Sequence, residues 1–240
     1  MRNYRWWLVF SKRAMLAWLT WLLAMPAGAV VNADRTRVVF NSDDIAQSLT
    51  LVNQGAQPAL VQVWTDSGNP LSSPDESDSP VVALPPIFKI MPAEIRTLKL
   101  MLSTRQTLQR DRENLFWLNL YQIPPNTQLQ SQSNKQVVLP LRLRLKLLVR
   151  PTGIGAPAES DGEKLHFSPQ GMTLRVDNPT PWYMTINIKL QGETDGINVM
   201  VPPRANVPVA LEKPPVIGQP FSWTVINDSG NYWVYQGVLR

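Results

Sequence analysis

The chain has 240 residues, no cysteine and one histidine, His166, and its formal net charge is +5. Without thiols it cannot use cysteine catalysis, disulfides or cysteine metal sites, and one histidine cannot build a multi-histidine zinc site. The first 29 residues hold four of the 23 Lys and Arg and no Asp or Glu. The rest of the chain therefore has 19 basic and 18 acidic residues, and this near-neutral balance gives no reason to predict nucleic-acid binding. No catalytic motif stands out, so we predict no enzyme, no cofactor and no metal.

The N-terminus has the layout of a secretory signal peptide. Four cations in the first 13 residues precede an apolar run of 12 residues, Ala14–Met25, which ends at Pro26. Small residues follow at the cleavage position, Ala27–Ala29. The alternative is a membrane anchor, which needs about 20 apolar residues. We therefore predict cleavage after Ala29, export, and no stable insertion in the membrane.

Short apolar segments, separated by Asn, Gly, Pro and Asp, then recur along the chain. Helical periodicity is nowhere sustained, and the spacing predicts an all-β sandwich. The first predicted strands are Arg37–Phe40, Ser48–Asn53, Leu60–Thr65, Pro85–Met91, Ile95–Leu102, Leu115–Ile123 and Val137–Val149. The stretch Asp66–Pro80, rich in Ser, Asp, Pro and Gly, is predicted to be a polar loop.

A domain boundary is predicted at Pro151–Pro157, which combines two prolines with two glycines. A second series of strands follows at Met172–Asp177, Trp182–Leu190, Ile197–Val201, Val207–Leu211, Phe221–Ile226 and Tyr232–Val238. His166, just before this series, is expected to be a partly exposed strand residue. We expect a signal peptide over 1–29 and two β-sandwich domains, over 30–151 and 152–240.

The strand Val137–Val149 has one apolar and one cationic face. Valine or leucine holds every odd position from Val137 to Leu147. The even positions include Arg142, Arg144 and Lys146. A period of two puts these two sets of side chains on opposite faces of the strand.

Four stretches carry family motifs in a fixed order: Asp34–Phe40 (DRTRVVF), Asp111–Pro125 (DRENLFWLNLYQIPP), Lys146–Pro151 (KLLVRP) and Asn178–Tyr183 (NPTPWY). They resemble the motifs of the periplasmic pilus-assembly chaperones, the PapD-like family, although Asn114 stands where Ser or Thr is usual. The resemblance implies two immunoglobulin-like β-sandwich domains, set at an angle with a cleft between them.

The resemblance also implies a non-catalytic function in the periplasm. Members of the family bind pilus subunits, whose own sandwich lacks its last strand. They fold and cap the subunit by lending a strand, which is donor-strand complementation. They then deliver it to an outer-membrane usher. The expected partners are therefore pilus subunits and an usher, and not nucleic acid.

By position, Arg37 and Lys146 match the pair that holds the C-terminal carboxylate of the subunit in the cleft. The chemistry is suitable, because a carboxylate accepts several charge-assisted hydrogen bonds. Every subunit has a C-terminus, so such a site sets the register of binding without recognising side chains. The alternative is that both residues are solvated strand cations.

The aliphatic face of the same strand matches the donor strand of the family. Val137, Leu139 and Leu141 match the residues that enter the subunit, and Leu143 would lie nearest the anchor. The alternative is that these side chains fill the core of the chain's own domain. Alternation allows both, with Leu145 and Leu147 at the inner end in the core and the outer end beyond it. Pro140, inside the predicted strand, has no N–H and must leave one ladder hydrogen bond unmade.

Glu113, Arg150 and Asp228 match a salt-bridge network between the two domains of the family. Such a network would set the interdomain angle, and for Asp228 the alternative is an ordinary turn aspartate. Arg142 and Arg144 match no residue with a role in the family. We interpret them as solvated cations on an exposed edge, where charge discourages self-association.

Two other functions compete with the chaperone. A structural pilin or adhesin should have an N-terminal extension of alternating apolar residues and one incomplete domain, whereas two domains look complete here. A secreted carbohydrate-binding or hydrolytic β-protein would need an aromatic platform or a catalytic pair, and neither stands out. The chaperone is therefore the preferred prediction.

Overall fold

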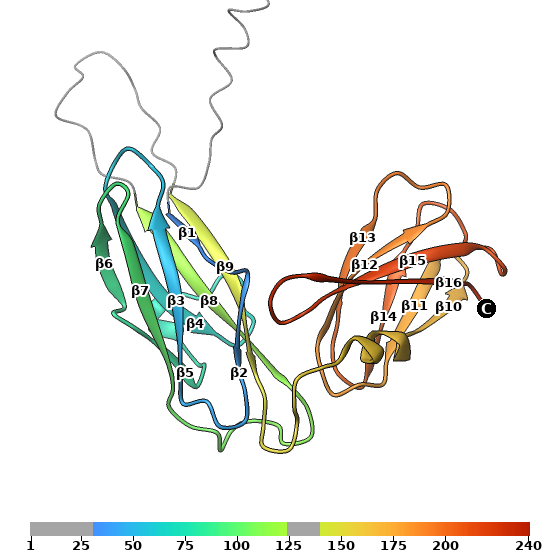
Figure 1. Cartoon of the computed structure of the whole chain (residues 1–240), viewed down its shortest axis with the longest axis horizontal. Coiled ribbons are helices and arrows are strands. Elements are labelled where there is room, and N and C mark those ends of the chain that lie inside the picture. The colour runs from blue at the N-terminus through green and yellow to red at the C-terminus, as the bar shows by residue number, and fades with distance from the viewer. Residues whose placement is uncertain (1–30, 124–139) are drawn as a thin grey trace, which may run out of the picture.

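The computed structural model describes residues 31–123 and 140–240 and is built almost entirely of β-strands (Figure 1). Its two sandwiches follow one another along the chain and are set at an angle (Figure 1). The predicted all-β fold with two immunoglobulin-like domains is therefore confirmed. The helices in the described part of the chain are short 3-10 turns, and none could cross a membrane.

The first sandwich consists of two sheets with strand orders β1-β3-β7-β5 and β2-β9-β8-β4-β6. Neighbouring strands in both sheets are antiparallel, except β2 and β9, which run parallel. The elements are β1 (Val31–Ala33), β2 (Arg37–Phe40), β3 (Ala46–Asn53), β4 (Ala59–Asp66), η1 (Pro74–Glu76), β5 (Val81–Leu84), β6 (Ile87–Ile90), β7 (Ile95–Leu102), β8 (Asn114–Ile123) and β9 (Leu141–Val149).

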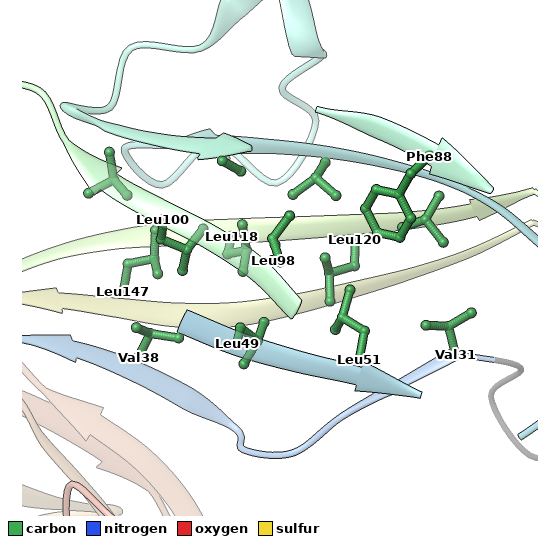
Figure 2. Packing of buried hydrophobic residues seen from close by; sticks show 14 of the residues in the cluster. Val31, Val38, Leu49, Leu51, Phe88, Leu98, Leu100, Leu118, Leu120 and Leu147 are labelled. Carbon is green, nitrogen blue, oxygen red and sulfur yellow. The ribbon is translucent and has the colours of Figure 1, made fainter. Parts of the chain in front are cut away.

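Alternate residues of these strands point into the core of the first sandwich (Figure 2). Leu98 and Leu100 of β7 and Leu118 and Leu120 of β8 are all 0% exposed. Burying each such side chain contributes about 1.5–3 kcal/mol. The inner end of β9 joins this core through Leu147, which anchors the strand that carries Lys146.

The second sandwich has its own core and two sheets, β10-β11-β14 and β13-β12-β15-β16. Aromatic rings fill part of it, with Trp223 stacked between Phe221 and Tyr235 at centroid distances of 5.2 and 5.1 Å. The elements are η2 (Glu159–Lys164), β10 (His166–Gln170), β11 (Thr173–Asn178), β12 (Met184–Leu190), β13 (Ile197–Val201), β14 (Ala205–Ala210), β15 (Pro220–Ile226) and β16 (Tyr232–Val238).

Most of the predicted strands agree with the structure to within two or three residues, but short edge strands were missed. The predicted strand Pro85–Met91 corresponds to β6, whereas β5, just before it, was not predicted. The two lie in different sheets, β5 beside β7 and β6 beside β4. All four residues of β5 are apolar, so its sequence has no alternation of apolar and polar residues to mark a strand. His166 is an exposed strand residue, as expected.

Candidate functional site

The parallel pairing of β2 with β9 brings the two predicted anchor residues together. Arg37 and Lys146 are direct partners in the register of these strands. Partners in neighbouring strands project to the same face of a sheet. Residues separated by more than 100 positions in sequence therefore place two cations side by side, at the junction with the second domain.

Arg37 is 4% exposed and contacts the second domain. Its Nη1 donates a hydrogen bond to the carbonyl of Ile226 at 2.9 Å. Its Nε is buried without a hydrogen-bond partner among the described residues. Burial lowers the pKa of Arg37, although the negative charges of Asp228 and Glu113 oppose this shift. The guanidinium therefore has hydrogen-bonding capacity that the described residues leave unused.

Lys146 is half-buried, and its Nζ donates to Thr185 Oγ1 of the second domain at 2.9 Å. Burial, followed by repulsion from Arg37, lowers the pKa of Lys146 to about 8. Over residues 31–123 and 140–240, no carboxylate lies within ion-pair distance of either cation. Two adjacent, partly desolvated cations without a counter-ion form a site suited to an anion.

Strand β9 continues beyond this pair with one edge open. Strand β2 pairs with Lys146–Val149, whereas β8 pairs with the whole of β9, so within the described chain Leu141–Leu145 has a neighbour on one side. Pro140 is exposed and precedes the first paired residue, so the expected loss of a ladder bond does not fall within β9. The free edge offers backbone N–H and C=O groups to an added strand.

The predicted donor residues lie in different surroundings. Val137 and Leu139 fall outside the described residues. Leu141 is 41% exposed, as a side chain that enters a partner would be. Leu143, by contrast, is partly buried and packs on the core of the first sandwich. Core packing therefore applies to Leu143, whereas the donor role of Leu141 stays a prediction.

Arg150 is the centre of an ion network that joins the two domains. Its side chain is 1% exposed, and its Nε donates to Glu113 Oε1 at 3.0 Å. Its Nη1 and Nη2 donate to the two carboxylate oxygens of Asp228 at 2.8 and 2.7 Å. Asp228 lies in the turn after β15, so this bidentate pair connects the end of β9 with the second sandwich. The structure thus brings the three predicted network residues together.

Glu113 is a second connection between the domains. Its Oε2 accepts a hydrogen bond from the backbone N–H of Tyr183 at 2.9 Å, and its own N–H donates to the carbonyl of Pro181 at 2.8 Å. Burial raises the pKa of Glu113 to about 7, against the opposing effects of Arg150 and of the Tyr183 N–H. A carboxylate buried this deeply depends on its cation to remain charged.

The interpretation of Arg142 and Arg144 as solvated cations was wrong. Their side chains are 25% and 19% exposed, and both approach the carboxylate of Asp66. Asp66 is the last residue of β4 and is 1% exposed, although it was assigned to a polar loop. An acid at the end of a strand pattern resembles an acid in a loop, so the sequence carried no signal for this contact.

Thr185 and the Ile226 carbonyl were also absent from the predicted site. Thr185 lies on β12 and Ile226 ends β15, both in the second domain. Each contacts a cation of the first domain only because of the angle between the sandwiches. No pattern in the sequence predicts the angle between the two domains.

Together, two immunoglobulin-like sandwiches, an interdomain ion network and a pair of adjacent cations define a two-domain protein of the β-sandwich class. The comparisons identify the family within that class. Residues 30–155 match the pili and flagellar-assembly chaperone PapD N-terminal domain, and residues 162–236 match the pili assembly chaperone PapD C-terminal domain. The chain therefore belongs to the PapD family of pilus-assembly chaperones.

Individual relatives agree with this assignment. The chain is 32% identical to chaperone protein MrkB of Klebsiella pneumoniae, over 81% of this chain and 85% of that protein. It is 31% identical to chaperone protein FimB/FhaD of Bordetella pertussis, over 90% and 91% of the two chains. The crystal structure of the Pseudomonas aeruginosa CupB2 chaperone superposes with a TM-score of 0.72 and 27% identity, over 87% of this chain and all of that one. As members of a chaperone family, such proteins are not enzymes.

Proposed function

We propose that this chaperone binds pilus subunits by lending them the outer part of β9, and then passes them to an outer-membrane usher. The observation that carries the proposal is the Arg37–Lys146 pair. Among the described residues, neither cation has a carboxylate within ion-pair distance, and the adjoining part of β9 has a strand neighbour on one side. A subunit that lacks a strand offers the complement, which is a strand edge and a terminal carboxylate.

In this proposal the terminal carboxylate of the subunit is the missing counter-ion. Lys146 Nζ and the unpaired Nε of Arg37 supply donors for it. A hydrogen bond to a charged group contributes about 1.5–3 kcal/mol, and more when both partners are charged and shielded from water. The carboxylate therefore fixes which residue of the subunit lies opposite each residue of β9.

The donor strand would extend outward from this anchor. Leu141 projects from the described part of β9, and we propose that Val137 and Leu139 continue the same row into the groove of the subunit. Each aliphatic side chain that becomes buried contributes about 1.5–3 kcal/mol. Leu143 packs on the chaperone's core and would complete the row at the anchor end.

The proposed location is the periplasm, where residues 1–29 would have been removed as a signal peptide. The mature chain would then consist of domains 30–151 and 152–240. The family assignment supports this location, because pilus subunits enter that compartment on their way to the usher. No nucleic-acid partner and no stable membrane insertion are proposed.

The proposal is tested by co-expressing the tagged chaperone with the pilus subunits encoded beside it and purifying the periplasmic complex. A one-to-one complex with a subunit is the expected result. The complex should be absent when the subunit lacks its last residues. A chaperone that is recovered alone in the presence of folded, monomeric subunit would contradict the proposal.

Leu141→Asp is expected to weaken subunit binding about tenfold or more while the free energy of unfolding changes by less than about 1 kcal/mol. Leu141 is 41% exposed, so the free chaperone loses little when it becomes polar. Leu143→Asp is the matched comparison, because it places a charge against the core and should cost about 2 kcal/mol or more. Urea unfolding and binding titrations measure both. Equal destabilisation by both substitutions would contradict the prediction that Leu143 is a core residue of the chaperone and Leu141 is not.

Subunit affinity is expected to fall as the pH rises above about 8. The pKa of Lys146 in the free chaperone is about 8, and the carboxylate binds the protonated form. The bound carboxylate raises that pKa, so the affinity should fall by up to about tenfold per pH unit between the free and bound values. Binding titrations from pH 7 to 9.5 measure the slope. A flat profile would show that Lys146 does not contact the bound anion.

A further inference from the structure

Asp66 is a buried carboxylate on the outer face of the sheet that contains β9. It is 1% exposed and accepts hydrogen bonds from the Gly68 N–H and from Asn119 Nδ2, both at 2.7 Å. Arg144 Nη2 donates to it at 2.5 Å. A buried carboxylate is costly unless it is paired, and here Arg144 of β9 is the paired cation.

Both arginines of β9 are also stacked on tryptophans. The guanidinium of Arg144 lies 4.7 Å from the ring centroid of Trp117, and that of Arg142 lies 4.6 Å from the ring centroid of Trp64. Such cation–π contacts are attractive and favour one orientation of the guanidinium. The arginines therefore hold β9 against β8 and β4 through their side chains as well as through its backbone.

Arg142 has three further hydrogen bonds that fix its position. Its Nε and Nη2 donate to Asn119 Oδ1 at 3.0 and 2.7 Å, and its Nη1 donates to the carbonyl of Pro70 at 2.7 Å. Asn119 in turn donates to Asp66, so it connects Arg142 to the carboxylate that Arg144 contacts directly. These contacts lie along Leu141–Leu145, the part of β9 that has a described neighbour on one side.

The same carboxylate does not reach Lys146. The register of the sheet places four residues in one row: Asp66, Trp117, Lys146 and Arg37. Trp117 thus separates Asp66 from Lys146 by two strand spacings, about 10 Å in all. Asp66 therefore neutralises Arg144, whereas Lys146 and Arg37 keep their charge available for an anion.

We propose that Asp66 is a positioning residue that sets the register in which a pilus subunit binds. It acts in two ways: it holds the outer half of β9 in place through Arg142 and Arg144, and it removes Arg144 as a competing carboxylate site. Arg144 lies two residues from Lys146 on the same face. A slip of two residues keeps every side chain on its face, so an unpaired Arg144 would accept the subunit carboxylate in a shifted register. This inference rests on the proposed function.

The test is Asp66→Asn, studied in the complete chaperone. Amide hydrogen exchange over Leu141–Leu145 should accelerate at least about tenfold, whereas exchange over Leu147–Val149 should not change. Affinity for the co-expressed subunit at pH 7 should fall about tenfold. The decrease in subunit affinity above pH 8 should become shallower. In this variant Arg144 binds the carboxylate in a fraction of the complexes, and an arginine remains charged at this pH. Glu94→Gln, which breaks the Glu94–Arg96 pair at 2.9 Å on another part of the surface, is the control and should change none of these.

The double variant Asp66→Asn/Arg144→Gln covers the case in which the single variant fails to fold. It removes the Asp66 and Arg144 charges together, so neither is left buried without the other; Arg142, 25% exposed, keeps its hydrogen bonds to Asn119. Exchange over Leu141–Leu145 should still accelerate, but the steep pH dependence should return because Lys146 is again the main anchor. The inference would be overturned if Asp66→Asn kept the hydrogen exchange, the subunit affinity and the pH dependence of the wild type. It would also be overturned if hydrogen exchange accelerated evenly over the whole first domain. If wild-type chaperone binds no subunit, the proposed function fails, while exchange in the free protein still tests how β9 is held.

Discussion

Replacing Lys146 with methionine is expected to weaken subunit binding about 100-fold without destabilising the free chaperone. The substitution would remove one charge-assisted partner of the subunit carboxylate in the proposed complex, worth about 1.5–3 kcal/mol. The carboxylate would also remain shielded from water beside Arg37 alone, which adds to the loss. Because about 1.4 kcal/mol corresponds to a factor of ten, an effect near 100-fold follows.

Lys146→Met should weaken subunit binding but increase the stability of the free protein. Burial lowers the pKa of Lys146 to about 8 from an ordinary value of 10.5, so the folded state disfavours the proton. Below pH 8 both states are protonated and the cost of the buried charge is fully present; between pH 8 and 10.5 the folded state releases its proton and the cost disappears. At pH 7, Lys146→Met should therefore raise the free energy of unfolding by roughly 1–2 kcal/mol, with allowance for partial solvation.

Urea unfolding at pH 7 and pH 10 and subunit titration at pH 7 measure these two effects. The stability difference between wild type and variant should be smaller at pH 10. Lys99→Met is the matched control, because Lys99 is an exposed strand lysine on the other sheet of the same domain. A variant that loses stability and binding in parallel would show that Lys146 is a structural residue.

Arg150→Met is expected to lower the free energy of unfolding by about 3–5 kcal/mol. The substitution leaves Glu113, with a side chain 1% exposed, without its cation, and it releases Asp228 from its bidentate pair. Subunit binding should also weaken, because the contacts of Arg37 and Lys146 with the second domain depend on the same interdomain geometry.

The loss of stability in Arg150→Met should be larger at pH 8 than at pH 5.5. The pKa of Glu113 is already raised to about 7, and it rises further once Arg150 is absent. A carboxyl with a raised pKa holds its proton in the folded state, so the stability of the variant falls as the pH rises through that range. At pH 5.5 Glu113 is neutral, and no buried anion is left behind.

Chemical unfolding of wild type and variants at both pH values tests this expectation. Asp228→Asn should cost about 1 kcal/mol, because Asp228 is 33% exposed and water can replace part of its pairing. Arg112→Met, at the surface pair with Asp111, should change stability by less than about 0.5 kcal/mol. Similar losses for Arg150→Met and Arg112→Met would contradict a buried network.

The residues of β9 show how far sequence reasoning extends. The alternation from Val137 to Leu147 predicted a strand and assigned its two faces, because a strand has a period of two whatever surrounds it. It allowed the inner end, Leu145 and Leu147, to lie in the core and the outer end to lie beyond it, but it did not fix the residue at which the strand leaves the core. Leu141 and Leu143 look alike in sequence, yet one is exposed and the other packs on the sandwich. That difference depends on where the opposing sheet ends.

The cations of β9 show the same limit more sharply. Arg142, Arg144 and Lys146 alternate identically, and motif resemblance selected Lys146 alone. What separates them is Asp66 and two tryptophans, which reach β9 from β4 and β8. The sequence by itself determined the all-β class, most strands, the family and the residue types of the proposed anchor, because these are local in the chain. Only the tertiary structure decided which cations pair with Asp66 and which have no carboxylate within ion-pair distance among the described residues, because charge pairing depends on strand neighbours and on the angle between the domains.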